Sequence, residues 1–144
     1  MRKWAIIFVC ALAGCSLLYK LKAKKWGDEI TKAMQIVKEV ASQVEANPMS
    51  VMEPATKSQY LSRLREAQTI LQAVSDQVKA SPASGALREA WENLDRGLDD
   101  VIKGVQLFSS AINLADVEKG RQAREAIQSG SAKLEKAKNL FLGK

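Results

Sequence analysis

The sequence predicts an all-α protein, an up-down antiparallel four-helix bundle that stands behind an N-terminal membrane anchor. Three observations carry this prediction. Apolar residues make up 47% of the chain but aromatic residues only 6%, a profile that suits helices better than sheets. Four stretches repeat apolar residues at spacings of four and three, which places them on one stripe of an α-helix. Short connections between the stretches make neighbouring helices antiparallel, and 144 residues leave room for one core.

The first fifteen residues have the order of a secretory signal. Arg2 and Lys3 precede an apolar run that starts at Trp4 and closes with Leu-Ala-Gly-Cys at residues 12–15. A basic start, a short apolar core and small residues before a cleavage point are typical of a signal peptide. With a cysteine directly after the small residues, the segment resembles the lipobox of bacterial lipoproteins, whose pattern is an aliphatic residue, two small residues and an invariant cysteine.

This resemblance implies where the chain sits. Residues 1–14 would be a cleaved signal peptide ending at the lipobox, Cys15 would carry the lipid, and residues 15–25 would be a lipid-anchored basic juxtamembrane segment. Several acyl chains on one cysteine anchor a protein stably, whereas one chain binds marginally. Ser16 follows the cysteine, and in this family a serine there is compatible with the outer membrane of a Gram-negative cell.

A second interpretation of the N-terminus stays open, in which it is an uncleaved transmembrane helix. The apolar stretch from Trp4 to Tyr19 has 16 residues, just below the roughly 17–25 that span a bilayer. The basic run at residues 20–25 would then flank the helix and tend to stay in the cytoplasm.

The net charge of +6 is concentrated beside this anchor. From Trp26 to Lys144 the chain has 16 basic and 16 acidic residues, so the predicted domain is neutral. Nucleic-acid binding needs a basic excess on the folded domain, so no nucleic-acid partner is expected. Anionic headgroups attract lysines near a bilayer, so contact with the membrane surface is predicted for Lys20, Lys22, Lys24 and Lys25.

The residue types that carry most enzyme chemistry are scarce. The chain has no histidine, and its only cysteines are Cys10, within the signal, and Cys15. This leaves no imidazole base or ligand, no disulfide framework and no free thiol once Cys15 is acylated. We therefore expect no catalytic residue, no metal site and no cofactor, and a protein that is not an enzyme.

The bundle is predicted to occupy residues 26–144. Its first helix, 26–44, ends before Asn47-Pro48, because the residue before a proline avoids the helical region. Residues 49–58 form the longest connection, in which apolar side chains either cap the core or make a contact site. The second helix covers 58–79 and ends at Ser81-Pro82. The predicted core stripes of the two helices are Trp26, Ile30, Ala33, Val37, Val40 and Val44, then Tyr60, Leu64, Ala67, Leu71, Val74 and Val78.

The third helix is predicted from Leu87 to Ile112, with Ser84 as a possible cap. Its stripe is Leu87, Trp91, Leu94, Leu98, Val101, Val105, Phe108 and Ile112. Carboxylates crowd its polar positions, namely Glu89, Glu92, Asp95, Asp99 and Asp100. Their spacing is not that of a calcium loop, and no histidine joins them as in di-iron bundles. We expect a solvated acidic face, partly paired with Arg88, Arg96 and Lys103.

After the third helix we predict either a tight turn, with Asn113 or Asp116 as a cap, or one long bent helix. The fourth helix, 117–142, carries the stripe Gly120, Ala123, Ile127, Gly130, Leu134, Ala137 and Phe141. Its small residues Gly120, Ala123 and Gly130 either pack closely against bulky partners such as Trp91 or Phe108, or leave a groove for an apolar ligand or a partner helix. An even number of helices returns the C-terminus towards the membrane.

Three functions remain from the sequence. The expected one is a lipoprotein of the cell envelope whose helical surface serves as a non-catalytic protein-interaction or structural module. The second is a binder of an apolar ligand beside Gly120, Ala123 and Gly130. The third, an enzyme that uses the acidic residues of the third helix, would need two carboxylates facing each other in a cleft, which the helical stripe disfavours.

Overall fold

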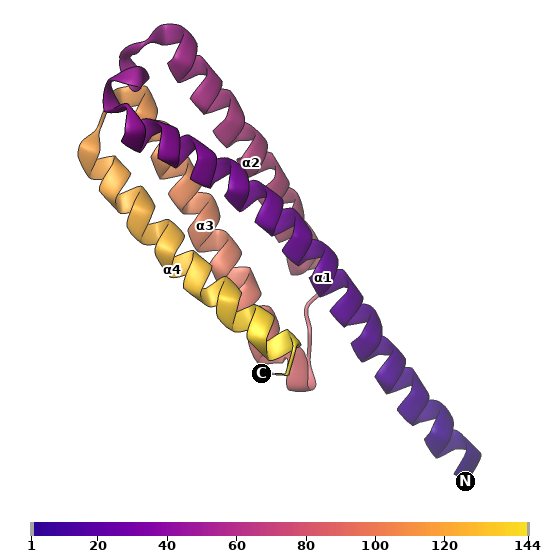
Figure 1. The fold of residues 1–144 in the computed structure, drawn as a ribbon. Helices are drawn as coiled ribbons and strands as arrows, with labels where there is room; N and C mark the ends of the chain where they lie inside the picture. Colours follow the sequence, from indigo (N-terminus) through magenta and orange to yellow (C-terminus); the bar gives the residue numbers. More distant parts are fainter. Residues whose placement is uncertain (1, 144) are drawn as a thin grey trace.

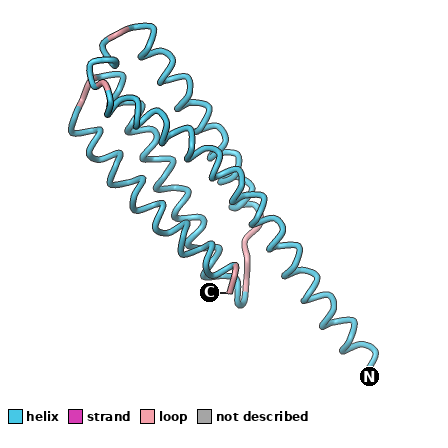
Figure 2. The backbone as a smooth tube through the Cα atoms, viewed as in Figure 1, coloured by secondary structure: helices cyan, strands magenta, loops and turns pink. Residues whose placement is uncertain are grey.

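The computed structural model describes the backbone of residues 2–143 and the side chains of residues 18–143. This part of the chain is all-α, an up-down bundle without strands, as predicted (Figures 1 and 2). The elements in order are α1 (Arg2–Ala46), the short 3₁₀ helix η1 (Pro48–Met52), α2 (Pro54–Ala80), the 3₁₀ turn η2 (Gly85–Leu87), α3 (Arg88–Leu114) and α4 (Val117–Phe141).

Helix α1 is one continuous element of 45 residues, about 68 Å long at 1.5 Å per residue. Its N-terminal part projects well beyond the other three helices (Figure 1). Tyr19 and Ala23 pack against the core, so the bundle begins seven residues before the predicted start at Trp26. The physical reason is that these two residues continue the four-three spacing of the stripe backwards along the same helix.

The core is built from the predicted stripes. Helix α2 buries all six of its predicted stripe residues, and α1 buries all but Val44, which is half-buried. Of the eight residues in the third predicted stripe, five are buried on α3, while Trp91, Phe108 and Leu87, which lies in η2, are half-buried against the core. The structure also buries residues outside the predicted stripes: Ile36, Ser75, Ala90, Gly97, Ile102, Gly104 and Ala111. A buried face wider than a single stripe is normal for a helix with neighbours on two sides.

The connection after α1 is shorter than predicted and consists mainly of the 3₁₀ helix η1. Pro54 occupies the first turn of α2, where its missing N–H is not needed. Within η1 the buried Ser50 hydroxyl lies 2.8 Å from the Tyr60 hydroxyl, which ties the connection to α2. Val51 packs against the core, whereas Met49 and Met52 remain exposed.

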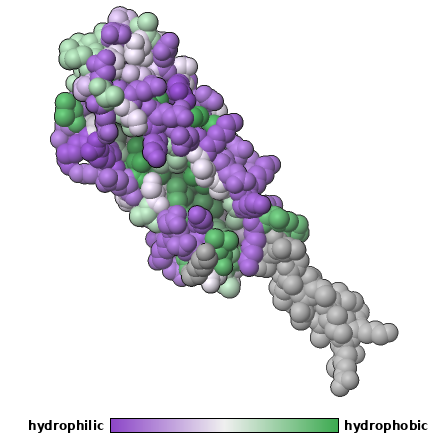
Figure 3. Space-filling view, in the orientation of Figure 1, coloured by the Kyte–Doolittle hydropathy of each residue, from purple (hydrophilic) through white to green (hydrophobic). Residues whose placement is uncertain are grey.

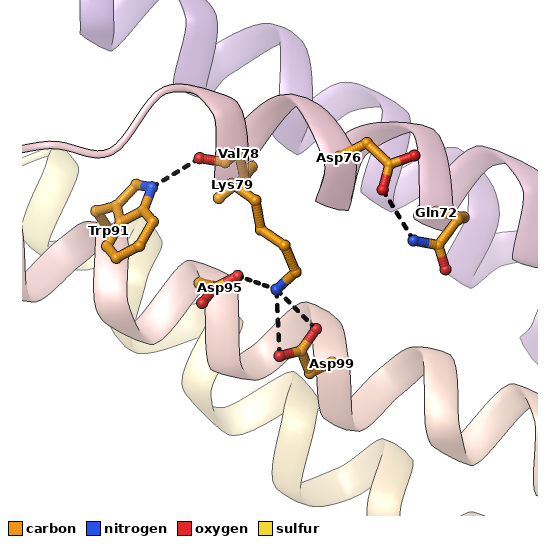
Figure 4. Close-up of polar contacts among 7 residues, drawn as sticks. All are labelled: Gln72, Asp76, Val78, Lys79, Trp91, Asp95 and Asp99. Carbon is orange, nitrogen blue, oxygen red and sulfur yellow. Dashed lines mark hydrogen bonds and ion pairs between the residues drawn. The ribbon is translucent and has the colours of Figure 1, made fainter.

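Helix α2 ends at Ala80, and the predicted break at Ser81-Pro82 is confirmed. The Ser84 side chain makes no capping hydrogen bond, because η2 comes between it and α3. Two contacts hold the helices together beside this connection. The Trp91 Nε1–H donates to the Val78 carbonyl oxygen at 2.9 Å, and the Lys79 ammonium pairs with Asp95 and Asp99 of α3 (Figure 4).

The tight turn predicted between α3 and α4 is confirmed, which excludes one long bent helix. Ala115 is left-handed, with φ +50°, and the Asp116 N–H donates to the Ala111 carbonyl at 2.9 Å. Asp116 caps α4 as predicted, since its Oδ1 accepts a hydrogen bond of 3.1 Å from the Lys119 N–H.

The four seams between neighbouring helices are unequal. Helices α3 and α4 pack most closely, and α2 lies between α1 and α3 with intermediate packing. Helices α1 and α4, which would close the bundle, scarcely touch. The C-terminus returns to the end where α1 enters the bundle, as predicted (Figure 1). There the ring centroids of Phe141 and Tyr19 lie 5.8 Å apart.

Candidate functional site

The open seam between α1 and α4 forms an apolar groove of about 700 Å³. It runs along α1 from Met34 to Glu45 and along α4 from Asp116 to Gln128, and η1 and the end of α3 close its far end. Figure 3 shows hydrophobic residues along this face, with hydrophilic side chains on both sides.

Three glycines, Gly97, Gly104 and Gly130, let α4 pack closely on α3, on the side of α4 away from the open seam. A Cβ on Gly130 would lie 2.5 Å from Val101 Cγ2 and 2.8 Å from the Gly97 carbonyl oxygen. A Cβ on Gly104 would lie 2.5 Å from Ile127 Cγ1 and 3.0 Å from the Ile127 nitrogen. Real Cβ atoms do not approach other atoms so closely, so these positions require glycine at the present spacing.

Apolar side chains from three helices line the groove. Val37 of α1, Ile112 of α3 and Ala123 of α4 are buried, and Phe108 and Ile127 are half-buried beside them. Helix α4 has no large side chain at Gly120, where the nearest atom to an added Cβ is Ala111 Cβ, at 3.9 Å. The groove therefore keeps an open part over Gly120.

Methionine gathers at this site. The three methionines after Met1 are Met34, Met49 and Met52, and all three line the groove. Met49 and Met52 are 71% and 63% exposed. Methionine is unbranched and polarisable, and it is over-used on surfaces that accept apolar partners of variable shape.

Charged residues mark the rim. Arg124 of α4 reaches across to Glu45 of α1, with an Nη2 to Oε1 distance of 2.9 Å, and joins the two edges of the groove. Arg121 is held on α4 by Glu118 and Glu125. The hydrogen bond from Arg121 holds the pKa of the Glu118 carboxyl below its ordinary value, and the same bond raises the pKa of the Arg121 guanidinium. These three exposed ion pairs each contribute little free energy, so the rim can rearrange.

The structure brings two of the three predicted groove residues together. Gly120 and Ala123 line the groove, whereas Gly130 lies in the α3–α4 interface against Val101 and Gly97. For Gly130 the close-packing alternative is the one observed, with Val101 and Gly97 of α3 as its nearest neighbours instead of Trp91 or Phe108. The glycines of each helix meet backbone atoms of the other helix, Gly130 the Gly97 carbonyl oxygen and Gly104 the Ile127 nitrogen, because glycine has no Cβ to keep the backbones apart.

The other predicted site residues lie at the opposite end of the molecule. Lys20, Lys22, Lys24 and Lys25 lie on α1 near its entry into the bundle, and all four are exposed. Cys15 lies outside the residues whose side chains are described. Within that described part, residues 18–143, no helix has a stretch long and apolar enough to cross a bilayer.

The acidic face of α3 is an ion-pair surface. Lys79 of α2 bridges Asp95 and Asp99, as Figure 4 shows, and Lys133 of α4 pairs with Asp100. The hydrogen bond from Lys79 to Asp95 raises the pKa of the Lys79 ammonium. The expected pairing with Arg88 is present, to Glu92, but the other partners are lysines from neighbouring helices instead of Arg96 and Lys103. Among the described residues, no group of acidic side chains is arranged to hold a metal ion.

Several functional features were missed by the sequence reasoning. Gly97 and Gly104 lie two helical turns apart on one face of α3, and that spacing is the signal that could have indicated a close helix contact. The clustering of the three methionines could not have been recognised from the sequence, because they come from two elements, α1 and η1. They meet beside the open seam, and the order of the helices alone does not show which seam is open.

Comparison with protein-family models, with curated proteins and with solved structures gives no match.

Proposed function

We propose that the protein is a membrane-anchored bacterial lipoprotein whose bundle is a non-catalytic interaction module of the cell envelope. Its binding site is the groove between α1 and α4, and its partner is an amphipathic helix of another protein. The observation that carries the proposal is the open fourth seam, where two helices that would complete an ordinary bundle scarcely touch and leave apolar side chains accessible.

The length of the groove fits a helix of about three turns. The α1 edge, Met34 to Glu45, is about 16 Å long, and the α4 edge, Asp116 to Gln128, about 18 Å. A helix of this length presents apolar side chains at positions i, i+3 or i+4, and i+7 on one face. Laid in the groove, it would fill the seam that α1 and α4 leave open.

The lining supports the same partner class. The groove is mainly apolar inside and charged at its edges, which is the arrangement that recognises an amphipathic helix. The methionines at η1 and Met34 can adapt to side chains of different shape. The Arg124–Glu45 pair crosses the mouth and would have to part when a helix enters.

A non-catalytic role is supported by the chemistry of the side chains. The sequence contains no histidine, and three of the α3 carboxylates, those of Asp95, Asp99 and Asp100, are engaged with lysines on neighbouring helices. The groove itself is lined by carbon-rich side chains, with Glu45 and Asp116 as its acidic residues. Such a lining favours binding over proton transfer.

A second candidate occupant is a free apolar ligand, which would make the protein a carrier or sensor. The volume of about 700 Å³ favours it, because small-molecule pockets range from roughly 300 to 1,000 Å³. A long hydrocarbon chain would lie lengthwise between Val37 and Ala123.

Photo-crosslinking in cells separates the two occupants. A photoreactive phenylalanine analogue at Val117, on the rim of the groove, should give a covalent adduct with a protein, and the same analogue at Glu66, exposed on α2, should not. An adduct of lipid mass at Val117 would instead support the ligand. Equal labelling from both positions, or none, would reject the groove as a binding site.

A blocking substitution tests the same site independently. Gly120→Leu should fill the open part of the groove and abolish the Val117 adduct. Gly27→Leu, at an exposed α1 position with nothing within 4 Å, is the matched control and should leave the adduct intact.

The membrane anchor is tested by the intact mass of the protein extracted from membranes, beside a Cys15→Ala variant. Loss of 14 residues together with added diacylglycerol mass, both abolished in the variant, would support the lipoprotein. An unmodified full-length chain in both samples would mean an uncleaved transmembrane anchor, and the bundle would then face the cytoplasm.

A further inference from the structure

Three segments that are distant in the sequence meet around Tyr19, at the end of the bundle opposite η1. The Tyr19 hydroxyl donates a hydrogen bond of 3.1 Å to the Ser81 carbonyl oxygen, in the connection after α2. Its ring packs edge-on against Trp26 and lies 5.8 Å, centroid to centroid, from Phe141 near the end of α4. This end of the bundle is therefore a single surface, made by α1, the α2–α3 connection and the C-terminus (Figure 1).

This surface lies very close to the expected lipid. Helix α1 is continuous through Cys15 and Tyr19, so one turn of helix, about 6 Å, separates the two residues along its axis. The headgroup layer on each side of a bilayer is about 5–7 Å thick. A lipid on Cys15 with its chains in the hydrocarbon would therefore place the Tyr19 end of the bundle within the headgroups, with no flexible tether to hold it away.

The side chains at this end have the chemistry of a lipid contact. Leu18, Leu21 and Leu142 are 62%, 57% and 59% exposed, although they are large and apolar. Leu18, Leu21, Lys22 and Lys25 are exposed and lie together on one side of α1 by helical spacing, outside the face that carries Tyr19, Ala23 and Trp26.

The charge of the same segment has one sign. Residues 18–27 contain Lys20, Lys22, Lys24 and Lys25 and no acidic residue. An exposed apolar residue beside lysines with long flexible stems is the composition of segments that lie at the boundary between headgroups and acyl chains.

We propose that the Tyr19 end of the bundle is a lipid-contact surface that sits on an anionic bilayer, with Leu18, Leu21 and Leu142 at the acyl boundary and the four lysines on the headgroups. The proposal rests on the membrane anchoring in the proposed function, and it adds an orientation. The groove opens between α1 and α4 with its η1 end held away from the bilayer.

The test uses the full mature protein in vesicles that contain anionic lipid and brominated acyl chains, which quench nearby tryptophan. A Leu142→Trp variant places a new fluorophore on the proposed surface. A Leu114→Trp variant is the matched control, because Leu114 is 60% exposed and lies at the opposite end of the bundle. The fluorescence added by each new tryptophan is measured relative to the unsubstituted protein.

The expected result is that brominated vesicles quench the fluorescence added in the Leu142→Trp variant and leave that added in the Leu114→Trp variant unchanged. If the protein floats with the vesicles and both added signals are quenched equally or not at all, the lipid-contact surface is rejected while the anchor stands. If the protein does not float with the vesicles, the anchor and the surface are both rejected.

The charge requirement is tested with paired substitutions on α1, made in the Leu142→Trp background. Lys22→Gln with Lys25→Gln should reduce the quenching in anionic vesicles to its value in neutral vesicles. Lys32→Gln with Lys38→Gln, which remove the same charge from exposed positions further along α1, should leave it unchanged. An equal reduction by both pairs would reject the role assigned to the juxtamembrane lysines.

Discussion

Two glycines on α4 lie ten residues apart and serve different purposes. At Gly130 an added methyl group would meet Val101 Cγ2 at 2.5 Å and the Gly97 carbonyl oxygen at 2.8 Å, so the helices must separate to accept it. At Gly120 the same group would meet only Ala111 Cβ, at an ordinary distance of 3.9 Å. Close helix packing therefore explains why residue 130 is a glycine, but it does not explain the glycine at residue 120.

Alanine at the two positions should change stability in opposite directions. Gly120→Ala should raise the free energy of unfolding by about 1 kcal/mol, because alanine is the better helix former. Gly130→Ala should lower it by about 1–3 kcal/mol through overpacking against α3. Urea denaturation of the two variants measures both values, and destabilisation by both would show that Gly120 also has a packing role.

A second residue-scale prediction concerns Ser75 on α2. Ser75 is 1% exposed, and its hydroxyl oxygen has no hydrogen-bond partner among the residues that the structure describes. Burying an unpaired hydroxyl costs about 1–3 kcal/mol, so Ser75→Ala should stabilise the protein by about 1 kcal/mol in the same assay. Ser50, buried with a hydrogen bond to Tyr60, is the matched control, and its alanine variant should be destabilised. A loss of stability in Ser75→Ala would indicate a bound water at this hydroxyl.

At the scale of elements, Tyr19 joins α1 to the α2–α3 connection and to the end of α4, and this contact should be visible in the pH dependence of stability. Burial raises the pKa of the Tyr19 phenol to about 12. The folded state therefore holds this proton more tightly than the unfolded state, whose phenol has an ordinary pKa near 10. The contribution of the neutral Tyr19 phenol to the free energy of unfolding is complete below pH 10, and it is lost as the pH rises from 10 to about 12.

The measurement is the unfolding free energy of the protein minus that of a Tyr19→Phe variant, followed against pH. Other alkaline groups such as Lys79 cancel in this difference. Below pH 10 the difference should be constant, at about 1 kcal/mol for the lost hydrogen bond to Ser81. It should then fall as the pH rises, and a difference that stays flat to about pH 12 would mean that water reaches the phenol.

The regular spacing of apolar residues explains why the helices and most of the core could be predicted. A four-three repeat fixes one face of a helix whatever it packs against, so the stripe of α2 is buried at each predicted position. The start of the bundle could not be predicted as well. Tyr19 closes the apolar run of the predicted anchor and Ala23 lies in the basic segment after it, so neither residue could be counted in the bundle from the sequence. Their place in the core depends on contacts with distant segments, such as that between Tyr19 and Phe141.

The groove was only partly predictable, for a different reason. Small residues on a helix indicate either close packing or open space, and the sequence does not say which. The distinction depends on the residue across the interface. Gly130 faces Gly97 and Val101 and is packed, while Gly120 faces away from any close neighbour and is open.

For the whole molecule, the unequal seams predict unequal local stability. Amide hydrogens in α3 and α4 should exchange most slowly with solvent, because these helices pack most closely with each other. Those of α1 between Met34 and Glu45 should exchange faster, although this stretch is equally helical, because one side of α1 faces the groove. Hydrogen exchange followed by mass spectrometry measures this order, and uniform protection of the four helices would contradict it.

Because α3 and α4 pack closely with each other, a partner in the groove affects mainly the attachment of α1 to the rest of the bundle. Helix α1 is held along one seam, to α2, so its release is the cheapest large opening of the domain. A ligand that bridges α1 and α4 binds only the closed form and makes that opening more costly by mass action. The free energy of opening α1, measured from its rate of proteolysis, should therefore rise with the logarithm of partner concentration. The α3–α4 hairpin should resist proteolysis equally with or without the partner.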